Sequence, residues 1–85
     1  MDYITVAIQP FVLAQTIFVY KNDTCVCQEK RNMKDLGPAI ANLAKEYSIK
    51  DVHIKGGLFH ANKLKSVLTS KKFDFDEPLN VVLHK

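Results

Sequence analysis

The stretch Met33–Leu58 reads MKDLGPAIANLAKEYSIKDVHIKGGL and decides the fold of this chain. Its apolar residues first recur every three or four positions, which is typical of one face of a helix. They then alternate with polar residues, which is typical of a strand. A helix that leads into a strand over so short a link favours parallel pairing with an earlier strand through a right-handed crossover.

The helix in this stretch has a clear end but an interrupted start. A Gly-Pro pair follows Leu36, so we expect Met33–Leu36 to form a preliminary turn and Pro38 to open the main helix. Asn32 is a good N-cap candidate, because its short side chain can accept a hydrogen bond from an amide at a helix start. We expect the helix to end near Tyr47.

Strands are expected on both sides of this helix. The first of them carries apolar or β-branched residues on both faces, so we expect the sheet to be covered there on both sides. A second helix is expected over Leu58–Lys72, and Phe73–Glu77 forms an acidic connector to the last strand. The expected strands are Asp2–Gln9, Gln15–Tyr20, Thr24–Lys30, Asp51–Lys55 and Leu79–His84.

The predicted order is strand, strand, strand, helix, strand, helix, strand. It gives an α/β fold with a single mixed five-stranded sheet, in which the first and fourth strands pair in parallel and the third lies at an edge. With 85 residues and no repeat or linker, residues 1–85 form one domain.

Composition and charge bear on two questions: whether the protein binds nucleic acid, and in which compartment we expect it. The net charge is +3, from 12 Lys and Arg against 9 Asp and Glu, and Arg31 is the sole arginine. A dedicated nucleic-acid binder usually carries more arginine. No run of about 18 apolar residues is present, which argues against a membrane span. The beginning lacks the basic and apolar regions of a signal peptide, so we expect a cytoplasmic protein.

Two cysteines, Cys25 and Cys27, are separated by one residue on an expected strand. At this spacing they should point to the same face, where they serve as small apolar side chains. Two alternatives stay open: a redox role, and half of a metal site completed by His53 or His60.

The segments ITVAIQPFVLAQTIFVYKNDT and LAKEYSIKDVHIKGG, together with the order of elements, resemble the ribonuclease H-like fold and its RuvC-type Holliday junction resolvases. This resemblance implies two-metal cleavage of phosphodiesters by converging carboxylates. The position that matches the family's first-strand aspartate holds Gln9, and Asp51–Lys55 has no acid at its carboxyl end. We therefore predict no catalytic residues, no metal and no cofactor, and a protein that is not an enzyme.

Two groups of residues are candidates for binding. The first surrounds the turn from the fourth strand to the second helix, where backbone amides and basic side chains could hold an anion or nucleic acid. It comprises Lys55, Gly56, Gly57, His60, Asn62, Lys63 and Lys65. The second consists of aromatic residues expected at the surface, which could anchor a protein interface. It comprises Phe11, Phe73 and Phe75.

Three functions follow, in order of preference. The first is a non-catalytic module that binds another protein, as a phage or mobile-element protein would bind a host factor. Homodimerisation through the edge strand around Cys25–Glu29 is a variant of it. The second is a nucleic-acid-binding module of weak specificity that uses the lysines of the second half. The third is a minimal RuvC-like nuclease.

Overall fold

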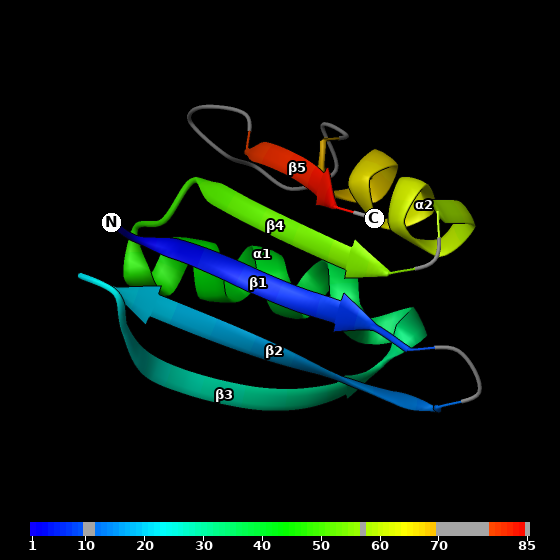
Figure 1. The fold of residues 1–85 in the computed structure, drawn as a ribbon, viewed down its shortest axis with the longest axis horizontal. Coiled ribbons are helices and arrows are strands. Elements are labelled where there is room, and N and C mark those ends of the chain that lie inside the picture. The colour runs from blue at the N-terminus through cyan, green and yellow to red at the C-terminus, as the bar shows by residue number, and fades with distance from the viewer. Residues whose placement is uncertain (10–11, 57, 70–78, 85) are drawn as a thin grey trace.

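The computed structural model describes residues 1–9, 12–56, 58–69 and 79–84. Its elements follow the predicted order (Figure 1). The strands are β1 (Tyr3–Ile8), β2 (Ala14–Lys21), β3 (Thr24–Asn32), β4 (Asp51–Gly56) and β5 (Asn80–His84). The helices are a short 3₁₀ helix, η1 (Met33–Asp35), followed by α1 (Leu36–Tyr47) and α2 (Leu58–Leu68).

The five strands form one mixed sheet in the order β3-β2-β1-β4-β5. The pairs β1–β2 and β2–β3 are antiparallel, whereas β1–β4 and β4–β5 are parallel. In the centre of the sheet, Ile4 of β1 lies opposite Val19 of β2 and Val52 of β4. The predicted fold class and the parallel pairing of the first and fourth strands are confirmed.

Both helices pack on the same face of this sheet (Figure 1), which makes a molecule of two layers. Isoleucine and valine side chains of the strands fill the space between the layers, where they pack against leucine and isoleucine side chains of the helices. Each such side chain contributes about 1.5–3 kcal/mol when it is fully buried. The central core residues are Ile4, Val6, Ile17, Val19, Val52 and Ile54 from the strands, and Leu36, Ile40, Leu64 and Leu68 from the helices.

The opposite face of the sheet is bare within the described residues. On β1 it carries Tyr3, Thr5 and Ala7, of which Tyr3 and Thr5 are half-buried and Ala7 is exposed. The expectation that the first strand is covered on both sides is therefore wrong. Its Tyr-Thr-Ala alternation has the same appearance in sequence whether a second helical layer covers that face or not.

The helix α1 begins earlier than expected. It starts at Leu36, and Pro38 falls within its first turn, where a missing N–H costs no hydrogen bond. Met33–Asp35 forms the preliminary turn as η1. Asn32 precedes it in an extended conformation, and its side chain makes no capping bond. The left-handed residue Ser48 ends α1, with its N–H bonded to carbonyls of the last turn.

A bulge in β3 separates the two cysteines. Cys25 pairs with Tyr20 and Cys27 pairs with Val19, so one extra residue, Val26, stands between them on β3. Because neighbouring residues of β2 point to opposite faces, Cys25 points to the bare face while Cys27 packs against the core. The expectation that both point to one face is wrong, since it assumed a regular strand.

The connection between β1 and β2 is organised by one buried amide. The Oε1 atom of Gln15 accepts a hydrogen bond from the N–H of Gln9 at 2.8 Å. Its Nε2 donates to the carbonyl oxygens of Gln9, at 3.1 Å, and Val12, at 2.9 Å. The side chain thus replaces backbone pairing where the β1–β2 hairpin passes into its loop.

The structure describes two α-helices, α1 and α2. None of them is long and apolar enough to cross a membrane.

Candidate functional site

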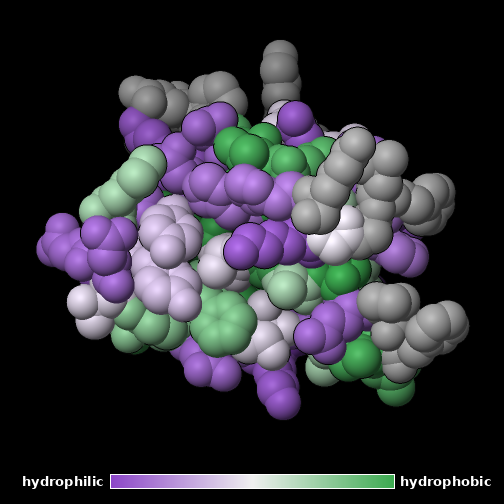
Figure 2. Space-filling model, in the orientation of Figure 1, coloured by the Kyte–Doolittle hydropathy of each residue, from purple (hydrophilic) through white to green (hydrophobic). Residues whose placement is uncertain are grey.

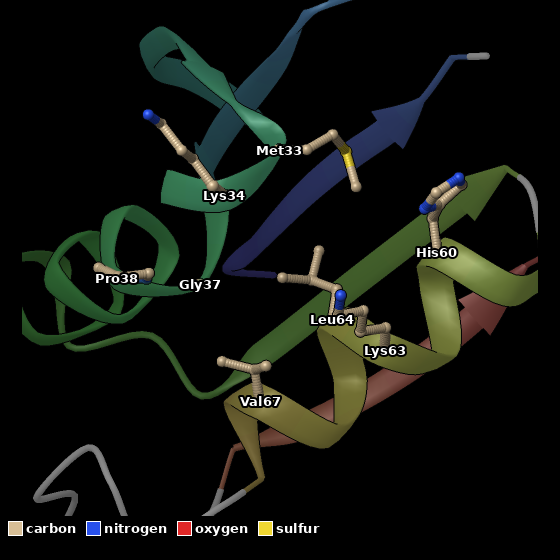
Figure 3. A pocket seen from close by; sticks show the side chains of 8 residues that line it. All are labelled: Met33, Lys34, Gly37, Pro38, His60, Lys63, Leu64 and Val67. Atoms are coloured by element: carbon tan, nitrogen blue, oxygen red, sulfur yellow. The ribbon is translucent and has the colours of Figure 1, made fainter.

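A groove lies between the start of α1 and the outer side of α2 (Figure 3). Its volume is about 490 Å³, within the range of ligand-binding clefts. In Figure 3, Met33 of η1 and Leu64 of α2 point into the space between the two elements. The groove is lined by Met33, Lys34, Gly37, Pro38, His60, Lys63, Leu64 and Val67. We call it the α1–α2 groove.

The described residues that line the α1–α2 groove include basic side chains but no acidic ones. Its floor is apolar, and its polar side chains are Lys34, His60 and Lys63. Among the described residues, no carboxylate lines the groove, and neither Lys34 nor Lys63 forms an ion pair. The groove therefore combines an apolar floor with positive charge from two separate elements, η1 and α2.

A second hollow, of about 380 Å³, continues from this groove along η1. It shares Met33 and Lys34 with the α1–α2 groove and adds Val12, Leu13 and Asn32. Leu13 is 87% exposed and Val12 is 45% exposed. Apolar side chains of this size beside a basic groove extend the surface on which a partner could bury apolar area.

The first group of predicted binding residues is divided by the fold. His60 and Lys63 line the α1–α2 groove, whereas Asn62 and Lys65 are exposed on α2 outside its lining. Lys55 lies on the bare face of the sheet, since it pairs with Ala7. The groove residues Met33 and Lys34 were not named from the sequence, because only the packing of α1 against α2 brings them beside Lys63. An apolar-basic pair at a helix start is the signal that could have drawn attention to them.

Gly56 has a packing role that needs no ligand. Its φ is 122°, a conformation that L side chains rarely adopt, and a Cβ here would collide with the carbonyl oxygen of Ile8. Gly57 lies outside the described residues. The same holds for all three predicted interface aromatics, Phe11, Phe73 and Phe75.

The bare face, which Figure 2 shows, carries a row of rings that comes from four strands. Tyr3 and Tyr20 stack with ring centroids 4.9 Å apart, and Tyr3 meets His53 edge-on at 5.5 Å. His53 and His84 stack at 5.0 Å, and Phe18 lies 6.5 Å from Tyr20. These side chains come from β2, β1, β4 and β5, so the row links the antiparallel and the parallel halves of the sheet.

The two histidines in this row form a hydrogen bond with each other. His53 Nδ1 and His84 Nε2 are 2.8 Å apart, which is the distance of a hydrogen bond in which one nitrogen donates and the other accepts. Within the described residues, no group of three or more His, Cys, Asp or Glu side chains is placed to hold a metal ion. The pair links β4 to β5.

Cys27 has a partner on α1. A hydrogen bond with Cys27 raises the pKa of the Tyr47 hydroxyl above its usual value of 10.0, and desolvation acts in the same direction. The protonated phenol, which can donate this hydrogen bond, is therefore favoured. This contact joins Cys27 of the edge strand β3 to Tyr47 at the end of α1.

Comparisons with known proteins bear on the fold alone. No protein-family model matches the sequence, and no curated protein is found to be similar. A crystal structure of a Bacteroides thetaiotaomicron protein, described as having an actin-like ATPase fold and unknown function, superimposes with a TM-score of 0.71. The sequences are 16% identical, and the alignment covers 98% of this chain but 32% of that one. This chain thus spans about a third of that protein and shares the ribonuclease H-like arrangement of strands and helices.

Proposed function

We propose that this chain is a non-catalytic binding module that holds an acidic, amphipathic segment of another protein in the α1–α2 groove. The observation that carries the proposal is the lining of the groove, with an apolar floor between Lys34 and Lys63 and no carboxylate among the lining residues that the structure describes. A helix with an apolar face and flanking Glu or Asp matches this arrangement, since such helices dock into apolar grooves through residues one turn apart.

The setting that fits this proposal is the cytoplasm. Cys25 and Cys27 are both free thiols, and free thiols persist in reducing compartments. A phage or mobile-element origin, with a host factor as the partner, stays a prediction from the sequence.

A nucleic-acid-binding module is the second proposal. Among the described lysines of the second half, Lys55 lies on the sheet and Lys63 lies in the groove, so the two are on different faces. Phosphate backbones are best held by a continuous basic track rather than by two lysines that flank an apolar floor. A RuvC-type nuclease is the weakest proposal, since the position of its first aspartate is occupied by Gln9.

The proposal can be tested with a fluorescein-labelled helical peptide of about 16 residues that carries Leu on one face and Glu on its flanks. Fluorescence anisotropy gives its affinity. Replacing both Lys34→Glu and Lys63→Glu should weaken binding at least about tenfold, because like charges then face each other. Binding by the native chain should also weaken as salt is raised.

The matched control makes the same change of charge away from the groove. Lys21→Glu with Lys65→Glu should leave the affinity within about twofold, since neither residue lines the groove; Lys65 is exposed and Lys21 is half-buried at the end of β2. Two results would overturn the proposal: equal binding of a peptide in which every Glu is replaced by Lys, or tighter binding of a labelled oligonucleotide that depends on the same two lysines.

A further inference from the structure

The bare face of the sheet is an ordered grid of side chains. Directly paired residues of neighbouring strands point to the same side, so the strand register defines three rows across β3, β2, β1, β4 and β5. The first row is Cys25, Tyr20, Tyr3, Asp51 and Asn80. The middle row is Gln28, Phe18, Thr5, His53 and Val82. The third row is Lys30, Thr16, Ala7, Lys55 and His84.

The two outer rows are opposites in both size and charge. At the centre of the first row stand the rings of Tyr20 and Tyr3, and the corresponding positions of the third row hold Thr16 and Ala7. On β4 the first row has the acid Asp51 and the third row has the base Lys55. Along the first row the face therefore carries large rings and an acid, and along the third row it carries small central side chains and a base.

We propose that two copies of this chain pair through their bare faces. A twofold axis along the middle row, at right angles to the strands, places the first row of each copy over the third row of the other. Tyr3 then fills the space above Ala7 of the second copy, and Asp51 meets Lys55 twice. Such self-complementarity is what an isologous interface requires.

The size and chemistry of the face fit this occupant. The molecule measures 31 × 29 × 21 Å, and the view down its shortest axis in Figure 2 shows this broad face. A face of these dimensions can supply the ~800 Å² that each partner gives to a standard interface. The strands β1, β4 and β5 are parallel, and parallel strands are ordinarily covered on both faces. A second sheet, packed at ~10 Å, supplies the cover that the helices leave out.

Single-stranded nucleic acid is a poorer occupant of the face. Base stacking needs ring faces that are open to the base. Tyr3 and Tyr20 stack on each other, and so do His53 and His84, so ring faces in both pairs are already in use. The interface is independent of the α1–α2 groove, which lies on the helical side.

Sedimentation equilibrium of the full chain tests the pairing. The native protein should be a dimer, and Ala7→Trp should raise the dissociation constant at least about tenfold, because the new ring occupies the space that Tyr3 of the second copy needs. Ala7 is exposed, so the monomer has room for the ring. Asn42→Trp, at an exposed position of α1, is the matched control and should leave the constant unchanged.

A charge swap tests the orientation of the two copies. Asp51→Lys and Lys55→Asp should each weaken the dimer about tenfold or more by placing like charges together. The double variant should restore the dissociation constant to within about threefold of the native value, because the pair is re-formed in reverse. Circular dichroism should show native folding throughout, since Asp51→Lys also removes the hydrogen bond to Asn80.

Three results would overturn the inference. One is a native chain that stays monomeric at the highest concentration measured. Another is a dimer that ignores Ala7→Trp, which would point to the β3 edge around Cys25–Glu29. The third is an Asp51→Lys, Lys55→Asp double variant that folds but stays as weak as the single variants, which would reject the proposed axis.

Discussion

A single amide, that of Gln15, decides how β1 passes into β2. Gln15 is 2% exposed and is the one polar side chain among the buried described residues. It makes three hydrogen bonds to the backbone of Gln9 and Val12. A buried amide that is fully paired costs little, but its loss leaves backbone groups without partners. Stability at this turn therefore rests on one residue that no local pattern singles out.

Replacement of this residue gives a direct prediction. Gln15→Leu should lower the free energy of unfolding by about 1–3 kcal/mol, because the Gln9 N–H and its neighbours lose their partners. Urea denaturation followed by circular dichroism measures the change. Asn42→Leu, at an exposed position of α1, should stay within about 0.5 kcal/mol of the native value. Equal effects of the two changes would contradict the assignment.

The helices and strands were predicted from local periodicity. Their arrangement in space was predicted only in part. The alternation in Asp51–Lys55 and the helical spacing before it depend on neighbours in sequence, so the strand, the helix and their parallel crossover could be inferred. The bulge at Val26 could not, because a one-residue irregularity in pairing leaves no trace in hydrophobic alternation. The side of the sheet that stays bare is likewise a property of how helices pack.

The candidate site was predicted to a smaller extent for the same reason. His60 and Lys63 were named because they follow a strand and a Gly-Gly pair on a helix. Lys34 reaches the same groove from an element 29 positions earlier in numbering, and only the contact between α1 and α2 brings the two lysines together. Contacts between distant segments are what single-sequence periodicity leaves out.

The junction between β4 and α2 depends on Gly56, which gives a prediction for a whole element. Gly56→Ala should destabilise the fold by about 1–3 kcal/mol, because the methyl group meets the Ile8 carbonyl and φ is positive. Thermal unfolding measures it, with Asn62→Ala, at an exposed position of α2 outside the groove lining, as the control, which should have a small effect. A Gly56→Ala variant as stable as the native chain would show that β1 and β4 separate easily at this end.

At the scale of the molecule, pairing of the bare faces leaves each α1–α2 groove on an outer side. The helices of the two copies point away from each other, because both helices lie opposite the bare face (Figure 1). A dimer would then offer two identical basic grooves at its two ends. Linked ligands gain affinity on such a receptor through effective concentration alone.

This arrangement predicts an avidity effect. Two copies of the acidic peptide joined by a Gly-Ser linker of about 60 residues, with a reach of about 40 Å, should span both grooves. The linked probe should bind the native chain about 100-fold more tightly than the single peptide does. With Ala7→Trp this gain should vanish while the single peptide binds as before. A gain that persists in the monomeric variant would mean that the two grooves do not cooperate.

The central place of β1 in the sheet also sets the order of events during synthesis. Its antiparallel neighbour β2 follows within a few residues. Its parallel neighbour is β4, so Ile4 can pair with Val52 only after β4 has been synthesised. While the ribosome makes the chain between β3 and β4, the edge of β1 that later pairs with β4 has no partner. The apolar side chains of these strands are also not yet covered by the helices. Non-local pairings of this kind form late and expose the nascent chain to aggregation. Translation pauses between β3 and β4 would therefore reduce the yield of native protein more than pauses placed after β4.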